Sequence, residues 1–326
     1  MPVDQPTPIE PAPRMAGPVF VTGAGGFLGR HIASAFVQAG RRTVGFGRRE
    51  PAAEPGLGVS APSAYVAGDL SREDLARAAR EHGAPAVLIH AAGGSSVGAS
   101  IADPQGDLAR NVGSLQESLA FLAEHAPQTR LVYLSSAAVY GAGAVGPIPE
   151  TARIDPVSPY GRHKAKAEAL IGEAATTWGV DAAIIRFFSA YGPGLRKQLL
   201  WDLAGRLLAR PAEVVLSGTG DEARDFLYAD DAAALALLLA GLPRQAEPLI
   251  VNGGSGRAVT VRQVAEALRD ALGLDAPIRF SGQTRPGDPE RLTADIARAR
   301  ALGFEPRVSL QDGMARAARW LKAALG

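Results

Sequence analysis

The stretch VFVTGAGGFLGRHIASAF, residues 19–36, joins an apolar run to an amphipathic segment through a glycine-rich turn. Its glycines Gly23, Gly26 and Gly29 form a GxxGxxG array. Glycine lets such a turn tighten and lets the backbone approach a pyrophosphate, whose charge is met by the N–H groups at the start of the helix. An ordinary strand-to-helix turn is the alternative, but the context favours a dinucleotide site. No GK[ST] follows, which excludes a Walker A loop.

Short apolar runs continue to alternate with longer amphipathic segments as far as about residue 188. This alternation is typical of β–α units around a parallel sheet that is covered on both faces. We therefore predict an α/β fold, with a Rossmann-type doubly wound parallel sheet over residues 17–188 and helices at 28–39, 71–82, 104–125 and 158–178. A smaller mixed α/β substrate-binding lobe is expected over residues 189–326, of which 226–252 return to the Rossmann domain.

The composition restricts the possible ligands. The 326 residues include 34 basic and 33 acidic side chains, so no net field would attract nucleic acid or an anionic membrane. The absence of cysteine excludes disulfides and thiolate nucleophiles, and it fits a cytoplasmic location. The five histidines are scattered, so we expect no metal site. Residues 1–16 are proline-rich without an apolar run, and we expect a disordered leader rather than a signal peptide or anchor.

The end of the second expected strand bears on the choice of cofactor. Folds that bind NAD usually carry an acid there for the ribose 2′-OH, but this chain has Gly47 followed by Arg48 and Arg49. Two guanidinium groups suit a 2′-phosphate, so we favour NADP over NAD. The alternative is a solvated basic turn, with Glu50 serving the ribose.

Two further strand ends are expected near the cofactor. Asp69, in VAGDL, either caps the helix beginning near Ser71 or accepts a hydrogen bond from the adenine amino group. The sequence HAAGG, residues 90–94, ends a strand in small residues, which permits a cofactor to lie close to the backbone.

The segment SPYGRHK, residues 158–164, places two titratable side chains on one helix face. Ser158 is a plausible N-cap and Pro159 suits the first helical position, so Tyr160 and Lys164 fall at i and i+4. A tyrosine has an ordinary pKa near 10, and a neighbouring ammonium, aided by oxidised nicotinamide, favours the phenolate and lowers that pKa. A hydroxyl that binds the substrate oxygen is expected from Ser135 or Ser136, at the end of YLSS.

With these motifs assembled, the sequence resembles the extended short-chain dehydrogenase/reductase family of NAD(P)-dependent nucleotide-sugar epimerases, dehydratases and reductases. The resemblance runs from Val19 to the C-terminus through TGAGGFLG, GDL, HAA, NVGS, SSAAVYG, YGRHK, RDFLYADD and RPGD, in the family's order. It implies Ser136, rather than Ser135, as the catalytic serine, Tyr160 as the acid/base, and Lys164 as the residue that lowers the pKa of Tyr160 and binds the nicotinamide ribose.

The resemblance also implies a binding site. Asn111 matches a helix asparagine that supports the site, and Arg224 and Arg285 match arginines that grip the substrate's pyrophosphate. The expected substrate-binding residues are Ser96, Ser136, Ser189, Arg224 and Arg285. The expected cofactor-binding residues are Gly23, Gly26, Phe27, Leu28, Gly29, Arg48, Arg49, Asp69, Leu70, Ala91, Ala92, Tyr160 and Lys164.

Some positions depart from the family pattern. Ala137 and Ala138 stand where dehydratases carry an acidic pair, so dehydration lacks an evident general acid. Ser189 stands where many members have asparagine, and Ser95 where galactose epimerases often have a lysine near the cofactor. The segment GLRKQLLWDLAGRLL is expected to line the nucleotide pocket.

The reading that we favour is hydride transfer between NAD(P) and C4 of a nucleoside-diphosphate hexose. A 4-ketoreductase using exchangeable NADPH is preferred because of the arginine pair, and a 4-epimerase with tightly bound NAD is the alternative. Two other classes stay open: a serine hydrolase, because GSSVG satisfies GxSxG around Ser96, and a non-catalytic NADP sensor. The family resemblance further implies a homodimer formed through the helices near 104–125 and 158–178.

Overall fold

The computed structural model describes residues 16–52, 54, 56–143, 146–283 and 291–326. The predicted leader, apart from Ala16, and Arg285 therefore lie outside the described residues. The large sheet has the strand order β3-β2-β1-β4-β5-β7-β11, and every pair in it is parallel. Its strands are β1 Val19–Thr22, β2 Thr43–Gly47, β3 Ala64–Ala67, β4 Val87–His90, β5 Arg130–Ser136, β7 Asp181–Phe187 and β11 Leu249–Gly253.

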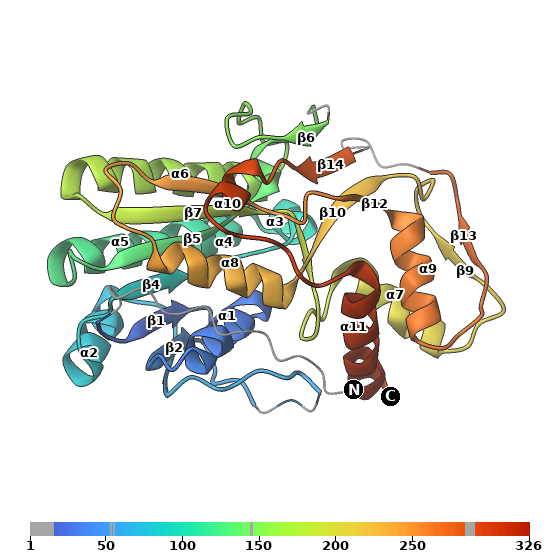
Figure 1. Ribbon diagram of the computed structural model, residues 1–326, viewed down its shortest axis with the longest axis horizontal. Coiled ribbons are helices and arrows are strands. Elements are labelled where there is room, and N and C mark those ends of the chain that lie inside the picture. The colour runs from blue at the N-terminus through green and yellow to red at the C-terminus, as the bar shows by residue number, and fades with distance from the viewer. Residues whose placement is uncertain (1–15, 53, 55, 144–145, 284–290) are drawn as a thin grey trace.

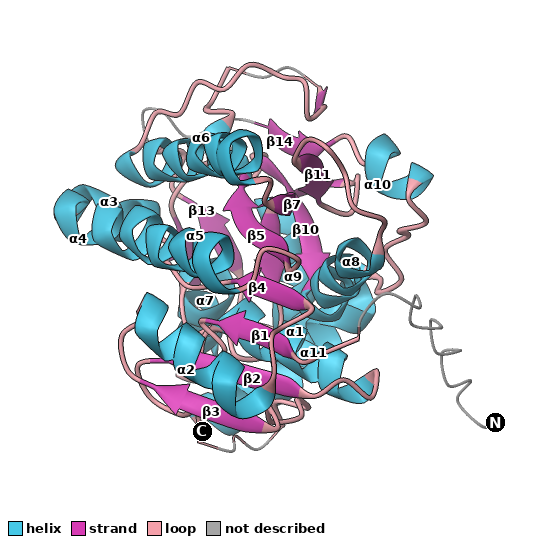
Figure 2. Cartoon of the chain, turned by 90° about the vertical axis from the view of Figure 1, so that its left-hand side faces the viewer, coloured by secondary structure: helices cyan, strands magenta, loops and turns pink. Residues whose placement is uncertain are grey.

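Helices cover both faces of this sheet (Figure 2). On one face, α1 Phe27–Gln38 and α8 Ala229–Gly241 pack together over a core that includes Phe36 and Leu235. On the other face lie α2 Arg72–His82, α5 Ser114–His125 and α6 Pro159–Trp178, whose apolar side chains form a second core. The predicted doubly wound sheet is confirmed. The expected helix over 104–125 is divided into α4 Pro104–Leu108, a π-helical turn Ala109–Gly113, and α5.

The chain beyond β7 builds a smaller lobe beside the sheet (Figure 1). Its apolar core includes Leu203, Val264 and Trp320. Since α8 and β11 lie in the large sheet's layers, we keep the division at residue 188 only as a proposed boundary. The remaining elements are α3 Val97–Ala102, β6 Pro147–Ile148, β8 Ser189–Tyr191, α7 Gln198–Leu208, β9 Val214–Leu216, β10 Ala223–Tyr228, β12 Ala258–Thr260, α9 Val261–Ala271, β13 Ile278–Phe280, β14 Arg291–Ala294, α10 Ala297–Ala301 and α11 Leu310–Leu325, with a 3₁₀ turn at Ala137–Val139.

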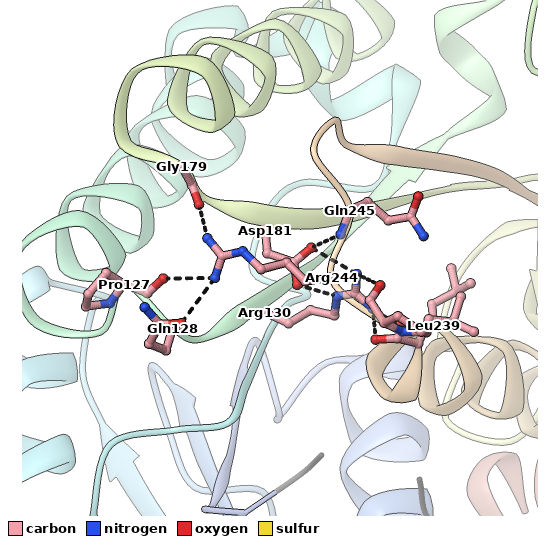
Figure 3. A network of polar contacts seen from close by, with 10 residues as sticks. Pro127, Gln128, Arg130, Gly179, Asp181, Leu239, Arg244 and Gln245 are labelled. Atoms are coloured by element: carbon pink, nitrogen blue, oxygen red, sulfur yellow. Dashed lines mark hydrogen bonds and ion pairs between the residues drawn. The ribbon is translucent and has the colours of Figure 1, made fainter. Parts of the chain in front are cut away.

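A buried ion pair joins the amino ends of two central strands (Figure 3). Arg130 begins β5 and donates Nε and Nη2 to the two carboxylate oxygens of Asp181, which begins β7, at 3.0 and 2.9 Å. Arg130 Nη1 also donates to the carbonyls of Leu239 and Leu242 at the end of α8. A bidentate pair with these additional acceptors satisfies both charges where water is excluded. The pair fixes the edge of the sheet opposite to the carboxyl ends of the strands.

Within the described part of the chain, no helix combines the length and apolar character needed to cross a membrane.

Candidate active site

A cavity of about 730 Å³ lies at the carboxyl ends of the large sheet's strands, between the sheet and the small lobe. This volume is typical of a site for a small molecule or cofactor. The cavity brings together most of the residues that the sequence singled out. They are Gly26, Phe27, Leu28, Gly29, Ala91, Ser136, Tyr160, Lys164, Ser189 and Arg224.

The glycine loop has the backbone geometry that a bound pyrophosphate requires. Gly23 adopts φ +67°, and a Cβ on it would lie 2.6 Å from the carbonyl oxygen of Ala91. A Cβ on Gly29 would overlap the carbonyl oxygen of Gly23. Gly26 is the N-cap of α1 and offers no side-chain acceptor to its first N–H groups. These free donors, in a loop open to the cavity, fit an anionic group at the helix start.

Tyr160 is positioned by the start of α6. The Ser158 hydroxyl accepts from the N–H of Gly161 at 3.1 Å, and Pro159 occupies the first turn, as predicted. A Cβ on Gly161 would lie 2.5 Å from the carbonyl oxygen of Ala138, so glycine lets α6 approach the loop after β5. This approach brings the Tyr160 phenol within hydrogen-bonding reach of Ser136.

Burial controls the titration of both α6 side chains. It raises the pKa of Tyr160 to about 12, although the hydrogen bond with Ser136 acts in the opposite direction. It also lowers the pKa of Lys164 to about 8, against the attraction of Asp107 and Glu168. The Lys164 ammonium donates to the carbonyl of Leu134 at 2.8 Å and lies 5.9 Å from the centre of the Tyr160 ring.

In the protein without cofactor, desolvation of the phenolate thus outweighs the hydrogen bond with Ser136 and raises the pKa of Tyr160. The expected lowering, which includes the charge of an oxidised nicotinamide, stays a prediction. At neutral pH the phenol is protonated, and Lys164 is mostly charged. A proton acceptor at this position needs further positive charge beside the ring, and an oxidised nicotinamide would carry such a charge.

A buried amide supports the opposite wall of the cavity. Asn111 lies in the π-helical turn, and its Nδ2 donates to the carbonyl of Asp107 at 3.1 Å. Its Oδ1 is buried and has no hydrogen-bond partner within the described ranges. A Cβ on Gly93, in the cavity wall, would lie only 2.6 Å from that oxygen. Asn111 does not itself line the cavity, so this buried acceptor is a cost carried beside the site rather than a contact offered to a ligand.

Several expected cofactor residues lie elsewhere. Arg48, Arg49 and Asp69 are exposed and do not line the cavity, and neither do Gly23, Leu70 and Ala92. The suggestion that Asp69 caps α2 is wrong, because Ser71 is the N-cap and accepts from the N–H of Asp74 at 3.1 Å.

Ser96 is occupied in a helix cap. Its hydroxyl accepts from the N–H of Ala99 at the start of α3, and it does not line the cavity. The described hydrogen bonds and ion pairs of the five histidines all go to other residues. The serine hydrolase alternative therefore has no base at its proposed nucleophile.

The cavity also contains residues that the local patterns did not single out. Arg30 and Glu54 lie beside the glycine loop, and Val157 and Leu292 line the wall near Tyr160 and Arg224. Arg196 and Lys197 belong to the segment that we expected to line a nucleotide pocket. Glu54 lies in an irregular connection between β2 and β3, for which sequence periodicity gives no signal.

A doubly wound sheet, a glycine loop at the start of α1, and a serine, tyrosine and lysine in one cavity define an extended short-chain dehydrogenase/reductase. The family model described as "NAD dependent epimerase/dehydratase family" matches residues 19–254. The chain belongs to that family.

Individual relatives agree over almost the whole chain. A UDP-glucose 4-epimerase of Azospirillum brasilense is 33% identical, with 92% of this chain and 90% of that protein covered. The structure of a UDP-glucose 4-epimerase of Thermotoga maritima with UDP-glucose has a TM-score of 0.84 at 25% identity, over 94% of this chain and 99% of that one. A UDP-glucose 4-epimerase of Thermus thermophilus in complex with NAD has a TM-score of 0.81 at 28% identity, over 94% and 99%.

These comparisons bear on two of our expectations. The chain is an enzyme of a nucleotide-sugar family, as predicted. The relatives favour the epimerase alternative over the ketoreductase that we preferred, and they give no support to NADP over NAD. Arg48 and Arg49 are exposed basic side chains outside the cavity, so the structure gives no support to the preference for NADP either.

Proposed function

We propose that the protein is an NAD-dependent 4-epimerase of a uridine-diphosphate hexose. The observation that carries this proposal is one cavity that contains a glycine loop at one end and the Ser136, Tyr160 and Lys164 side chains at the other. The sugar and the uridine nucleotide are proposed from what the relatives act on.

When bound, oxidised nicotinamide supplies a hydride acceptor for C4 of the sugar and a positive charge beside the Tyr160 phenol. Tyr160, as phenolate, accepts the proton of the sugar 4-hydroxyl, and Ser136 Oγ donates a hydrogen bond to the same oxygen. Lys164 stabilises the phenolate electrostatically. On return of the hydride, Tyr160 gives the proton back to the 4-oxygen, so the sugar undergoes no net oxidation.

Epimerisation requires the 4-keto sugar to present its other face before the hydride returns. The wall beside Ser136 is built from small side chains, Ala137 and Ala138, and from Gly94 across the cavity. Small residues leave room for the sugar to turn. The same alanines supply no carboxyl group to expel water, which argues against dehydration.

The cofactor should be NAD that stays bound through turnover, since the hydride removed in the first half-reaction is needed in the second. Gly26 and the start of α1 are the groups of this chain that would hold its pyrophosphate. A freely exchanging NADP(H) would instead favour the ketoreductase. Mass spectrometry of the nucleotide released from freshly purified protein decides between these readings.

The catalytic assignment is tested by Tyr160→Phe, with Tyr133→Phe as the matched control. Both hydroxyls are buried, but Tyr133 does not line the cavity. We expect Tyr160→Phe to lower kcat for the interconversion of UDP-glucose and UDP-galactose by about 10²–10⁴-fold while cofactor occupancy persists. Tyr133→Phe should leave kcat within about threefold of wild type. A Tyr160→Phe enzyme with a normal rate would remove the phenol from the mechanism.

We also propose that the protein acts in the cytoplasm as a homodimer formed through the helices near 104–125 and 158–178, as the family resemblance implied. A sedimentation experiment that finds only monomer at micromolar concentration would contradict the dimer.

A further inference from the structure

The segment Gly194–Lys197, between β8 and α7, connects the two loops that flank the glycine loop. Arg196 forms an ion pair with Glu54, which lies in the connection after β2. The Lys197 ammonium donates to the hydroxyl of Ser95, after β4, and lies 3.3 Å from the Ser95 carbonyl oxygen. In the sheet, β1 lies between β2 and β4, and β1 leads into the glycine loop. A segment that contacts the loops after β2 and β4 therefore crosses over the loop after β1.

We call the segment Gly194–Lys197 the strap. Glu54, the partner of Arg196 in the strap, is also linked to the glycine loop. Glu54 accepts from Arg30 Nη1 at 2.9 Å and from Trp320 Nε1, on α11, at 3.0 Å. Arg30 Nε donates to the carbonyl of Gly25 at 3.0 Å. Burial acts to raise the pKa of Glu54, but the hydrogen bonds from Trp320, Arg196 and Arg30 outweigh it and lower that pKa. An ionised Glu54 thus links the small lobe to the phosphate-binding loop.

The Lys197 side of the strap differs, because the Lys197 ammonium has no acidic partner among the described residues. Within the described residues Lys197 forms no ion pair with a carboxylate, and its side chain lines the cavity. Burial lowers its pKa. The next residue, Gln198, adopts φ +65°, a left-handed conformation that is uncommon outside glycine. Among the described residues, an ammonium without a carboxylate partner thus lies beside a cavity and next to a strained residue, an arrangement often found at ligand sites.

We propose that Lys197 binds the pyrophosphate of the dinucleotide, and that the strap, anchored by Glu54, encloses the cofactor. This inference rests on the proposed function, in which NAD must be retained between the two half-reactions. A pyrophosphate held by the N–H groups at the start of α1 would lie next to the strap, where Lys197 would supply a positive charge. Release of the cofactor then requires the Arg196–Glu54 pair to break as well as the contact to Lys197.

The test compares Lys197→Gln with Lys197→Arg and with the control Lys322→Gln, an exposed lysine on α11. The probe is NADH titrated into nucleotide-free protein and followed by its fluorescence. Loss of a charge-assisted hydrogen bond should raise the Kd of Lys197→Gln about 10–100-fold. Lys197→Arg should stay within about threefold of wild type, and Lys322→Gln should not change. Glu54→Gln should accelerate NADH dissociation more than it raises the KM for the sugar nucleotide.

An NADH Kd within twofold of wild type in Lys197→Gln overturns the proposal. So does an unchanged NADH Kd with weaker binding of UDP, because Lys197 would then serve the substrate's diphosphate. Failure of the proposed function is a separate outcome. The wild-type protein could fail to epimerise UDP-hexoses while its affinity for NADH or NADPH still depends on Lys197. That result contradicts the proposed epimerase function and supports the role of the strap in cofactor binding.

Discussion

Replacing Lys164 with methionine should abolish turnover and stabilise the folded protein at the same time. The residue Lys164 is 4% exposed, and burial lowers the pKa of its ammonium from an ordinary value of 10.5 to about 8. A buried ammonium is held in the native state at a cost, because it has lost much of its hydration. Methionine is a flexible apolar side chain of comparable length, so it can occupy the same space without that cost.

The magnitude follows from the pKa. One pKa unit corresponds to about 1.4 kcal/mol, so charging Lys164 in the folded protein at neutral pH costs about 3 kcal/mol. Methionine also loses the hydrogen bond from the ammonium to the Leu134 carbonyl, and a hydrogen bond of a charged group is worth about 1.5–3 kcal/mol. The net gain at pH 7 is therefore about 1 kcal/mol. With an unfolding entropy of about 2.1 cal/mol/K per residue, this raises Tm by about 1–2 °C.

The pH dependence distinguishes this cause from a general effect on packing. Below pH 8 the lysine is protonated in both the folded and unfolded states, and the penalty is fully present. Between pH 8 and 10.5 the unfolded state binds more protons than the folded state, so the stability of wild type rises with pH. The advantage of Lys164→Met should therefore shrink across this window and reverse above it, where only the lost hydrogen bond to Leu134 remains.

The assay is denaturant unfolding of nucleotide-free wild type, Lys164→Met and the exposed control Lys322→Met at several pH values from 7 to 10.5. Nucleotide must be removed, because a ligand bound only to the folded state adds its own stabilisation. The reasoning is refuted if Lys164→Met is less stable than wild type at pH 7. It is also refuted if the difference between the two proteins does not change with pH.

Other predictions follow from the two edges of the sheet. Arg130→Met should lower the free energy of unfolding by about 3–5 kcal/mol by leaving the Asp181 carboxylate buried and unpaired, while kcat per folded molecule stays unchanged. Burial lowers the pKa of His90 to about 3, so stability should fall as the pH drops below 6.5, and His90→Gln should reduce that slope in acid unfolding curves. Gly29→Ala should lose NADH binding, measured by titration, because its Cβ overlaps the Gly23 carbonyl.

Most of the large sheet could be predicted because its information is local. The run VFVT is wholly buried in β1, and the apolar spacing of α1 places Ile32 and Phe36 in the core. The N-terminal cap of α6 could also be predicted, because Ser158 and Pro159 act within three residues of their own positions in the sequence. The π-helical turn over Ala109–Gly113 was not predicted, because it changes the backbone hydrogen bonds without interrupting the helical pattern.

The candidate site was predictable only where chemistry is carried by neighbouring residues. Tyr160 and Lys164 lie on one turn of helix, and Ser136 ends a strand that the pattern had located. Glu54 and Arg196 are 142 residues apart, and Lys197 and Ser95 are 102 apart, so no local spacing connects them. The raised pKa of Tyr160 in the protein without cofactor could not be predicted for the same reason. It depends on how much of the fold covers the phenol, which the motif does not state.

The contrast between two buried charges, Arg130 and Lys164, supports the location of the site without any motif. At the amino edge of the sheet, Arg130 and Asp181 satisfy each other in a bidentate pair. Near the carboxyl edge, Lys164 is buried and desolvated inside the cavity that forms the candidate site. A desolvated charge of this kind is a cost to a marginally stable protein, and such groups cluster at functional sites. For the same reason, replacing Lys164 should stabilise the folded protein, although the lysine is needed for activity.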